Sequence, residues 1–432
     1  DFVSLSGTSL LPRLALLSMG RKSHSSVVKK ENEPALSIEK KFVVSHPTGN
    51  TFVRALLEEL QKNQQLGKFH TTIGAGSSIN PLVKALSQKR GYAIPDSKIS
   101  RQWIPELVRL LAKGDQSKKR KRTDHSYLAL DKKVSSKLTK QDTQVLHAYE
   151  DGAYYSFNRA KELGIQCSYE LPIAHWATVR RLLAEEAERY PQWEPTLEST
   201  REPEEKLFRK EEELRMADRI TCPSQFVLDS IPKEIKQNTP CQVSPFGSPR
   251  SQPSDGTIVT KTSNLLKLLF VGSMTQRKGL ADLFETMKLL KKEPVTLSIL
   301  GQPSLPMEFY RKQFSDFQYF PPCSNQKVRE IMLNHDILIL PSIVEGRALV
   351  QQEALSCGLT IIVTRNAGGE DLVEEGLTGH IVPIRSPEKL AQCILKNLEE
   401  RNSLKEKKAE CLRKAKQYSW AEYASNIIDN NK

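Results

Sequence analysis

The stretch ILILPSIVEGRALVQQEALSCGLTIIVTRNAGGEDLV, residues 337–373, decides the fold of this chain. It opens with an apolar run, 337–340, which predicts a buried strand, and a Pro-Ser turn follows. An acidic loop then leads into a predicted helix that Gly358 ends, and a second apolar strand begins at Thr360. Strand, loop, helix and strand in this order form a βαβ unit, in which ligands bind beyond the carboxyl ends of the strands.

Two carboxylates occur where this unit is expected to meet a ligand. Glu345 lies in the loop, and Glu353 follows eight residues later on the predicted helix. If the segment between them is helical, at ~1.5 Å per residue, the two lie roughly 12 Å apart. Two acids at that distance cannot share one proton, but they can hold the two ends of an extended polar ligand such as a sugar and a ribose. The alternative is a pair of solvated carboxylates on a charged helix.

The pattern resembles the E-x7-E motif of the retaining family-four glycosyltransferases, which have the GT-B architecture. The flanking residues also fit the family motif: Pro341-Ser342, Gly346, Ala354-Leu355, Cys357-Gly358 and Asn366-Ala367-Gly368. The resemblance extends from about residue 42 to the end of the chain. It implies two facing Rossmann-like α/β domains with a cleft between them. The implied reaction is transfer of a sugar from a nucleotide-sugar to an acceptor hydroxyl, with retention at the anomeric carbon.

A basic turn after the first strand of the second half is similar to the family's diphosphate-binding turn. It runs from Gly272 to Gly279 and contains Arg277 and Lys278. Both cations suit phosphate oxygens and are expected to stabilise the departing diphosphate, on which negative charge develops. Many relatives have an arginine directly after the first glycine, where this chain has Ser273. An exposed basic turn is the alternative.

The resemblance also implies roles for single residues. Glu353 is expected to hold the ribose hydroxyls, and Glu345 is expected to orient the donor sugar. Many relatives have Phe-Gly where this chain has Arg347-Ala348, so the Arg347 side chain is expected either to contact an acidic substrate or to point to solvent. The expected donor-binding residues are Glu353, Gly272, Gly346, Arg347, Ala348, Leu349 and Gly49.

The first half supplies weaker candidates. Gly49 lies in the turn HPTGN, 46–50, directly after a predicted strand at 42–45, and an ordinary turn glycine is the alternative. His125 is predicted to be the histidine that such enzymes place near the donor sugar, which completes a catalytic set with Glu345, Lys278 and Arg277. The carboxylates of Glu150-Asp151 and Glu170 are interpreted as solvated, with contact to an acceptor hydroxyl as the alternative.

Composition shifts and alternating elements predict the domain organisation. Residues 1–40 are predicted to be a disordered or targeting tail, and 41–245 an N-terminal Rossmann-like domain on the acceptor side. The Pro-, Ser- and Gly-rich segment 246–263 predicts a linker. Residues 264–415 alternate between strands and helices, which is typical of a doubly wound parallel sheet that binds the nucleotide-sugar. Residues 416–432 are expected to form a terminal helix that crosses back to the first domain, and 101–148 are predicted to be mostly helical.

Composition limits the cofactors and partners. The formal net charge of +13 favours phosphate-bearing partners, namely a nucleotide-sugar or an anionic membrane, and no nucleic-acid motif accompanies it. The basic run 118–122 is interpreted as a solvated loop or a contact with lipid headgroups, with a nuclear-localisation signal as the alternative. The family resemblance implies a saccharide, lipid or small-molecule acceptor. No Asp-x-Asp motif occurs, which predicts an enzyme without metal or other cofactor. Seven scattered cysteines predict reduced thiols and a cytoplasmic setting.

Two alternative functions remain open at the level of sequence. The first is another enzyme on the same fold, an epimerase or a phosphorylase. The second is a non-enzymatic basic protein that binds a membrane or a nucleic acid through residues 101–140.

Overall fold

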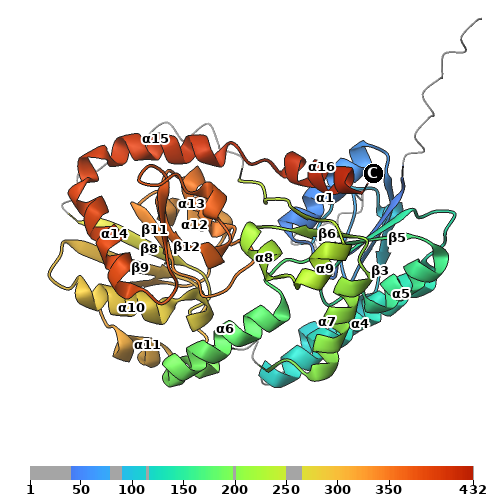
Figure 1. Ribbon diagram of the computed structural model, residues 1–432, viewed down its shortest axis with the longest axis horizontal. Helices are drawn as coiled ribbons and strands as arrows, with labels where there is room; N and C mark the ends of the chain where they lie inside the picture. Colours follow the sequence, from blue (N-terminus) through green and yellow to red (C-terminus); the bar gives the residue numbers. More distant parts are fainter. Residues whose placement is uncertain (1–39, 78–89, 113–115, 198–200, 250–264, 432) are drawn as a thin grey trace, which may run out of the picture. The chain divides into compact units, whose positions relative to one another are not determined.

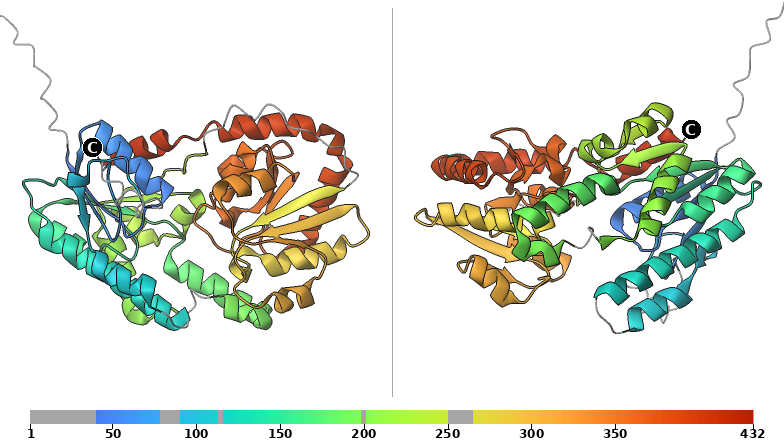
Figure 2. Two further views of the ribbon diagram at one scale, coloured as in Figure 1. Left: turned by 180° about the vertical axis from the view of Figure 1, so that it is seen from behind. Right: turned by 60° about the horizontal axis from the view of Figure 1, so that its bottom comes forward.

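The computed structural model describes residues 40–431 except for 78–89, 113–115, 198–200 and 250–264. Residues 1–39 of the predicted tail and most of the predicted linker therefore lie outside the described residues. The described chain forms two parallel sheets, each with helices on both faces, as Figures 1 and 2 show. The expected pair of Rossmann-like α/β domains is confirmed.

The first sheet is entirely parallel and has the strand order β3-β2-β1-β4-β5-β6-β7. Its sequence order reverses between β1 and β4. The strands are β1 (Phe42–Ser45), β2 (Leu66–Thr71), β3 (Ile99–Arg101), β4 (Val145–Tyr149), β5 (Gln166–Glu170), β6 (Arg219–Cys222) and β7 (Cys241–Val243).

The helices of this half of the chain are α1 (Thr51–Lys62), α3 (Trp103–Leu111), α4 (Gln116–Lys137), α5 (Tyr154–Leu163), α6 (Trp176–Arg189), α7 (Glu204–Met216), α8 (Gln225–Ser230) and α9 (Lys233–Asn238), with single 3-10 turns at η1 (Asp96–Lys98) and η2 (Pro191–Thr196). Alternate residues of β1 enter two different cores. Val43 packs with the α4, α5 and α7 side, whereas Phe42 and Val44 pack with the α1 side. Figure 2 shows α4 and α5 side by side on one face of the sheet.

The prediction that 101–148 is mostly helical is confirmed by α3 and α4, but the C-terminal end of this range belongs to a strand. There, β4 is a central strand, buried over its whole length. Its sequence, VLHAY, hides this role because a histidine interrupts the apolar run. His147 is buried, and its Nδ1 contacts Ser168 Oγ on the neighbouring strand at 2.9 Å, which gives one of the two ring nitrogens a hydrogen-bond partner inside the core.

The second sheet is also parallel and has the order β10-β9-β8-β11-β12-β13. Its strands are β8 (Leu266–Val271), β9 (Val295–Leu300), β10 (Gln318–Phe320), β11 (Ile337–Leu340), β12 (Thr360–Thr364) and β13 (Gly379–Val382). Its helices are α10 (Leu280–Leu289), α11 (Met307–Gln313), α12 (Asn325–Met332), α13 (Val350–Ser356), α14 (Pro387–Glu399) and α15 (Leu404–Ala415). Single 3-10 turns occur at η5 (Gln276–Lys278), η6 (Arg365–Ala367), η7 (Glu370–Leu372) and η8 (Arg401–Ser403).

The last helix, α16 (Trp420–Asn430), packs against α1 of the first domain (Figure 1). Its Tyr423 is buried and donates a hydrogen bond of 2.6 Å to Glu170 Oε2 at the end of β5. Glu170 is itself buried, so its interpretation as a solvated carboxylate was wrong. The carboxylate anchors the C-terminal helix instead.

One segment of the first half packs with the second domain. Trp193, in η2, is 1% exposed and lies in the core of the second domain. Its ring centroid is 5.0 Å from that of Phe309 and 5.7 Å from that of Tyr310, both on α11. The preceding helix, α6, shares an apolar cluster with Ile343 and Val344, which follow β11. Residues 176–197 therefore join the two domains, although their place in the sequence assigns them to the first.

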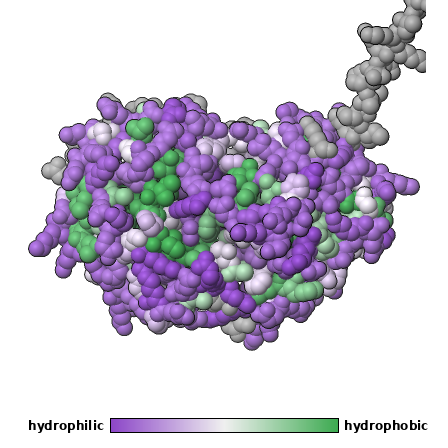
Figure 3. Space-filling model, viewed as in Figure 1, coloured by the Kyte–Doolittle hydropathy of each residue, from purple (hydrophilic) through white to green (hydrophobic). Residues whose placement is uncertain are grey.

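The face in Figure 3 is largely hydrophilic, with smaller hydrophobic areas between the hydrophilic residues. Within the described ranges, the helices are all too short or too polar to cross a membrane.

Candidate functional site

The candidate site lies where β8 and β11 are neighbours. Leu268 pairs with Ile337, and Leu269 with Leu338. Strands β8, β9 and β10 extend the sheet in one direction, and β11, β12 and β13 extend it in the other. The strand order therefore reverses between β8 and β11, and open parallel sheets bind ligands beyond the carboxyl ends of the strands at such a point. The turn after β8 and the loop after β11 both emerge there.

Three charged side chains meet at this edge. Arg277 Nη1 lies 2.7 Å from Glu345 Oε1, and Lys278 Nζ lies 2.6 Å from the same oxygen. The side chains of Lys278 and Glu345 are only 12% and 11% exposed. Two positive charges and one negative charge leave a net charge of +1 on the cluster. The cluster can therefore attract an anion while its carboxylate stays ionised.

Burial and charge act in opposite directions on these groups. Burial would raise the pKa of Glu345, but Arg277 and Lys278 outweigh it and hold the pKa below its ordinary value. For Lys278 burial is the larger effect, and it lowers the pKa against the opposing influence of Glu345. A lysine that is incompletely neutralised in a buried position gains from the approach of an anionic phosphate.

Close backbone contacts fix the turn of the two cations against the loop of Glu345. The backbone of Ile343 donates to the carbonyl of Arg277 at 2.9 Å. Gly279 has a left-handed φ of 75°, and a Cβ at this position would lie 2.0 Å from the Pro341 carbonyl oxygen. Only glycine fits such a position without strain. The cations and the carboxylate are thus held by rigid main chain.

Glu353 lies in the first turn of α13, but the segment before it is not helical. The helix begins at Val350, so the distance of roughly 12 Å that assumed a continuous helix, at ~1.5 Å per residue, does not apply. The Glu353 side chain is partly buried, and burial raises its pKa. Among the described residues, no donor contacts its carboxylate, so its oxygens remain available as acceptors.

Arg347 takes neither of its two expected orientations. Its side chain is fully buried, and its Nη1 and Nη2 contact the two carboxylate oxygens of Asp371 at 2.6 and 3.0 Å. Nε donates to Gln352 Oε1 at 3.1 Å, and Nη1 also donates to the Gly368 carbonyl at 3.1 Å. Four of its five N–H donors contact protein acceptors, and its role in donor binding stays a prediction. The arginine braces the loop after β11.

Two other candidates in that loop, Gly346 and Leu349, contact the first domain. A Cβ on Gly346 would lie 1.7 Å from the carbonyl oxygen of Pro172, which follows β5. The Gly346 carbonyl accepts a hydrogen bond of 2.7 Å from Ser224 Oγ. Leu349 packs against the core around α1 and α16, and Ala348 is buried in the core of the second domain. Contact between the domains alone accounts for a glycine at position 346.

The remaining candidates lie apart from this cluster or beside it. Gly272 directly follows β8, and a Cβ there would lie 3.4 Å from Cε of Lys278, so the glycine borders the lysine side chain. Gly49 precedes α1 and packs against the Tyr92 ring. His125 is exposed on α4, a helix that packs on α3 and α5. No described contact joins His125 to Glu345, and its predicted role stays a prediction.

A polar cluster that sequence reasoning missed lies next to the two cations. Gln276 is fully buried and donates to Glu186 Oε2 of α6 at 2.6 Å and to Asp282 Oδ2 at 2.9 Å. Arg189 Nη2 contacts Asp282 Oδ1 at 2.7 Å, and Arg385 pairs with Glu186. This cluster ties α6 to the turn that holds Arg277 and Lys278. The sequence signal was faint, because α6 reads as an ordinary charged helix.

The first domain has its own reversal of strand order, between β1 and β4. Glu150 follows β4 there, and Lys210 Nζ lies 3.6 Å from its Oε1. Burial raises the pKa of Glu150 to about 7, against the lowering effect of Lys210. Asp151 pairs with Lys206 at 3.1 Å. The interpretation of Glu150 as solvated was therefore wrong, because the carboxylate is inside an ion-pair network.

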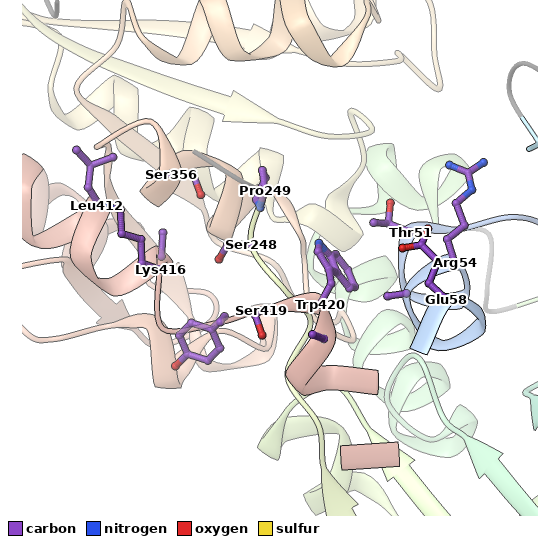
Figure 4. A pocket seen from close by; sticks show the side chains of 14 residues that line it. Thr51, Arg54, Glu58, Ser248, Pro249, Ser356, Leu412, Lys416, Ser419 and Trp420 are labelled. Atoms are coloured by element: carbon purple, nitrogen blue, oxygen red, sulfur yellow. The ribbon is translucent and has the colours of Figure 1, made fainter. Parts of the chain in front are cut away.

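A cavity of about 580 Å³ lies where the chain passes between the domains (Figure 4). Its lining side chains come from α1, from the segment after β7 and from the ends of α13, α15 and α16. Neither the two cations nor Glu345 nor Glu353 lines it, so it is distinct from the candidate site. Elsewhere in the described part of the chain, no group of three or more His, Cys, Asp or Glu side chains is placed to hold a metal ion.

The two parallel sheets and the crossing helix define a GT-B fold, and solved structures agree. A sucrose-phosphate synthase from Thermosynechococcus elongatus superposes with a TM-score of 0.63 at 16% identity, over 90% of this chain and 97% of that chain. The Anabaena protein HepE in complex with UDP gives a TM-score of 0.59 at 13% identity, over 90% and 98%. At these identities the likeness shows the fold.

Residues 266–400, which make up most of the second domain, match the family model described as Glycosyl transferases group 1. D-inositol 3-phosphate glycosyltransferase of Pseudarthrobacter chlorophenolicus is 30% identical over 126 residues, 27% of this chain and 30% of that protein. A putative colanic acid biosynthesis glycosyltransferase, WcaL, of Salmonella typhimurium is 27% identical over 141 residues, 29% and 34%. The chain spans about a third of the length of these relatives.

Proposed function

We propose that this protein is a glycosyltransferase that moves a sugar from a nucleoside-diphosphate sugar to an acceptor hydroxyl, with retention and without a metal ion. The observation that carries the proposal is the buried cluster of Arg277, Lys278 and Glu345 at the reversal of strand order in the second domain. It lies within the segment that matches the group 1 family model. The match to glycosyltransferases favours this reaction over the epimerase and phosphorylase alternatives.

The two cations would bind the diphosphate of the donor. The Lys278 ammonium has three donors, and the described contacts account for one of them. When the bond between the sugar and the diphosphate breaks, the charge that develops on the phosphate would be balanced by Lys278 and Arg277, which are already in place. This positive charge would do the work that a divalent ion does in other transferases.

The two glutamates would hold the ends of the donor. The Glu353 carboxylate is partly buried and accepts no hydrogen bond from the described residues, so it can accept hydrogen bonds from the ribose hydroxyls. Glu345 is fixed by the cations, and one of its oxygens, Oε2, has no contact among the described ion pairs at this cluster. That oxygen would orient the sugar. The acceptor oxygen would then bond to the anomeric carbon on the face that the phosphate leaves, and its proton would pass to the departing phosphate oxygen.

The first test is a screen of nucleotide-sugars by thermal shift, because a ligand that binds only the native state raises its stability. UDP-sugars come first, since HepE, a structure of the same fold, was solved with UDP and with UDP-glucose. The protein is then incubated with the nucleotide-sugar that binds, labelled in its sugar, and the products separate the possible reactions. Transfer to an acceptor supports the proposal, whereas epimerisation without acceptor or consumption of free phosphate would replace it.

Lys278→Ala tests the role of the cluster. We expect turnover to fall by ~10²- to 10³-fold, the loss that follows removal of one preorganised donor to a developing anion. Lys288→Ala, an exposed lysine on α10, is the matched control and should keep full activity. Because Lys278 is buried, a second measurement separates binding from folding. Lys278→Ala should weaken binding of UDP but not of uridine, whereas Glu353→Gln should weaken both. Full activity of Lys278→Ala would refute the proposed mechanism.

A further inference from the structure

Helix α3 exposes its large hydrophobic side chains to solvent and buries its glutamate. Six of the eleven exposed large hydrophobic side chains in the described part of the chain lie on this nine-residue helix. Their exposed fractions run from 39% at Leu107 to 73% at Leu111. The six are Trp103, Ile104, Leu107, Val108, Leu110 and Leu111. Monomeric proteins rarely expose a contiguous apolar surface of this kind unless it binds something.

The charged side of α3 is the buried one. Glu106 is 1% exposed and accepts hydrogen bonds from Arg90 at 2.9 Å, from Arg109 at 2.8 Å and from Ser126 Oγ of α4 at 3.0 Å. Burial would raise the pKa of Glu106, but these donors outweigh it and keep the carboxylate ionised. A buried carboxylate with its donors in place fixes the rotation of the helix. The hydrogen bonds of Glu106 therefore hold the apolar side of the helix toward solvent.

A basic surface adjoins the apolar one. Helix α4 packs on α3 and begins at Gln116 with the run Lys118-Lys119-Arg120-Lys121-Arg122. Lys119 and Lys121 are exposed. An apolar helix face that carries a tryptophan and several leucines next to lysines has the composition of helices that lie in the surface of an anionic bilayer.

We propose that the α3 face and the N-terminal turns of α4 form a docking surface for a membrane that contains anionic lipids. The apolar side chains would enter the boundary between headgroups and acyl chains, with the Trp103 ring at headgroup level. Lys119 and Lys121 would meet the lipid phosphates. A second copy of this chain is a poorer occupant, because two such faces in contact would bring two basic runs together. The proposal does not depend on the glycosyltransferase activity.

The test is flotation of the full chain with vesicles of phosphatidylcholine alone or with phosphatidylserine added. We expect binding to the anionic vesicles only, with an affinity that falls as salt is added. Lys119→Glu/Lys121→Glu should weaken binding by roughly 30-fold or more, since each lysine near an anionic surface contributes about 5-fold. Ile104→Ser/Leu111→Ser should weaken it by at least a similar factor. All four residues are exposed, so the fold should tolerate these changes.

Matched variants on the second domain serve as controls. Lys291→Glu/Lys292→Glu and Leu289→Ser change exposed residues of the same types and should leave binding unchanged. Trp103 emission should shift to the blue with anionic vesicles, and Trp103→Phe should remove this shift. Absence of binding to anionic vesicles, or equal losses in the control variants, would overturn the proposal. A concentration-dependent dimer that the α3 variants abolish, without vesicle binding, would assign the surface to a second copy instead.

Discussion

Replacement of Asp371 by asparagine should show how strongly the loop after β11 depends on one ion pair. Arg347 is fully buried, and both of its terminal nitrogens contact the Asp371 carboxylate. An asparagine at this position would keep the shape of the side chain and remove its charge. The guanidinium would then stay buried with neutral acceptors only: the amide oxygen of the new asparagine, Gln352 Oε1 and the Gly368 carbonyl, the last two at 3.1 Å each.

The expected loss of stability depends on how deeply the Arg347 and Asp371 side chains are buried. Removal of one partner from a buried ion pair costs about 3–5 kcal/mol, because the other charge is left uncompensated. The Asp371 side chain is 37% exposed, so water can reach the guanidinium once the carboxylate is neutral. We therefore expect a loss of about 2 kcal/mol in Asp371→Asn, at the lower end of the range for hydrogen bonds to charged groups.

The assay is a double-mutant cycle of Asp371→Asn and Arg347→Met. Because a two-domain chain need not unfold in one step, the local free energy of opening is measured by hydrogen exchange of the amides in 341–349. The double variant should lose about 1–3 kcal/mol less than the sum of the single losses, since it leaves no unpaired buried charge. Additive losses would refute the reasoning.

The pair also has a pH signature. Burial would raise the pKa of Asp371, but Arg347 outweighs burial and holds it below the ordinary value. The native state then binds fewer protons than the unfolded state near pH 4, so the stabilisation is complete above about pH 4 and is lost as the pH falls through the native pKa. Asp371→Asn should remove this part of the pH dependence.

Two further changes probe the junction of the domains. Gly346→Ala places a Cβ 1.7 Å from the Pro172 carbonyl oxygen and should cost about 1–3 kcal/mol of stability in thermal or urea unfolding, as overpacking does. Gly152→Ala, whose Cβ would be 3.8 Å from its nearest neighbour, is the control, and equal losses would contradict the close contact. Glu186→Gln weakens the link between Gln276 and Arg385, so amides of α6 should exchange faster, by ~10-fold for each 1.4 kcal/mol lost. Glu188→Gln, on an exposed position of the same helix, should exchange as the native chain does.

The sequence predicted the second domain well, because its strands are uninterrupted apolar runs. The run 337–340 and the run from Thr360 are both strands, and they carry Glu345 and Glu353 where the βαβ pattern places them. The cations at 277 and 278 contact Glu345 because adjacent strands end at the same edge. Local patterns of this kind determine local structure, and here tertiary contacts agreed with them.

Other features depend on partners distant in sequence and could not be predicted. The residues next to Arg347 in the sequence do not show that it pairs with Asp371, which lies 24 residues further along the chain. Glu170 looks solvated until the tyrosine of the last helix is placed beside it. The sequence of α3 is that of an ordinary amphipathic helix. Only the contacts of Arg90 and Ser126 with the Glu106 carboxylate show that the glutamate, and not the leucines, faces inward.

The packing of Trp193 has a consequence for anyone who would dissect or recombine this chain. A fragment that starts at the first strand of the second sheet, as the family match at 266–400 invites, would lack an aromatic side chain that fills the core between α10 and α11. A large void in place of a buried tryptophan costs several kcal/mol, about 3–5 for truncation to alanine. A chimera that takes its second domain from a relative should therefore take the segment that corresponds to residues 176–197 from the same relative, although this segment lies in the first half of the chain.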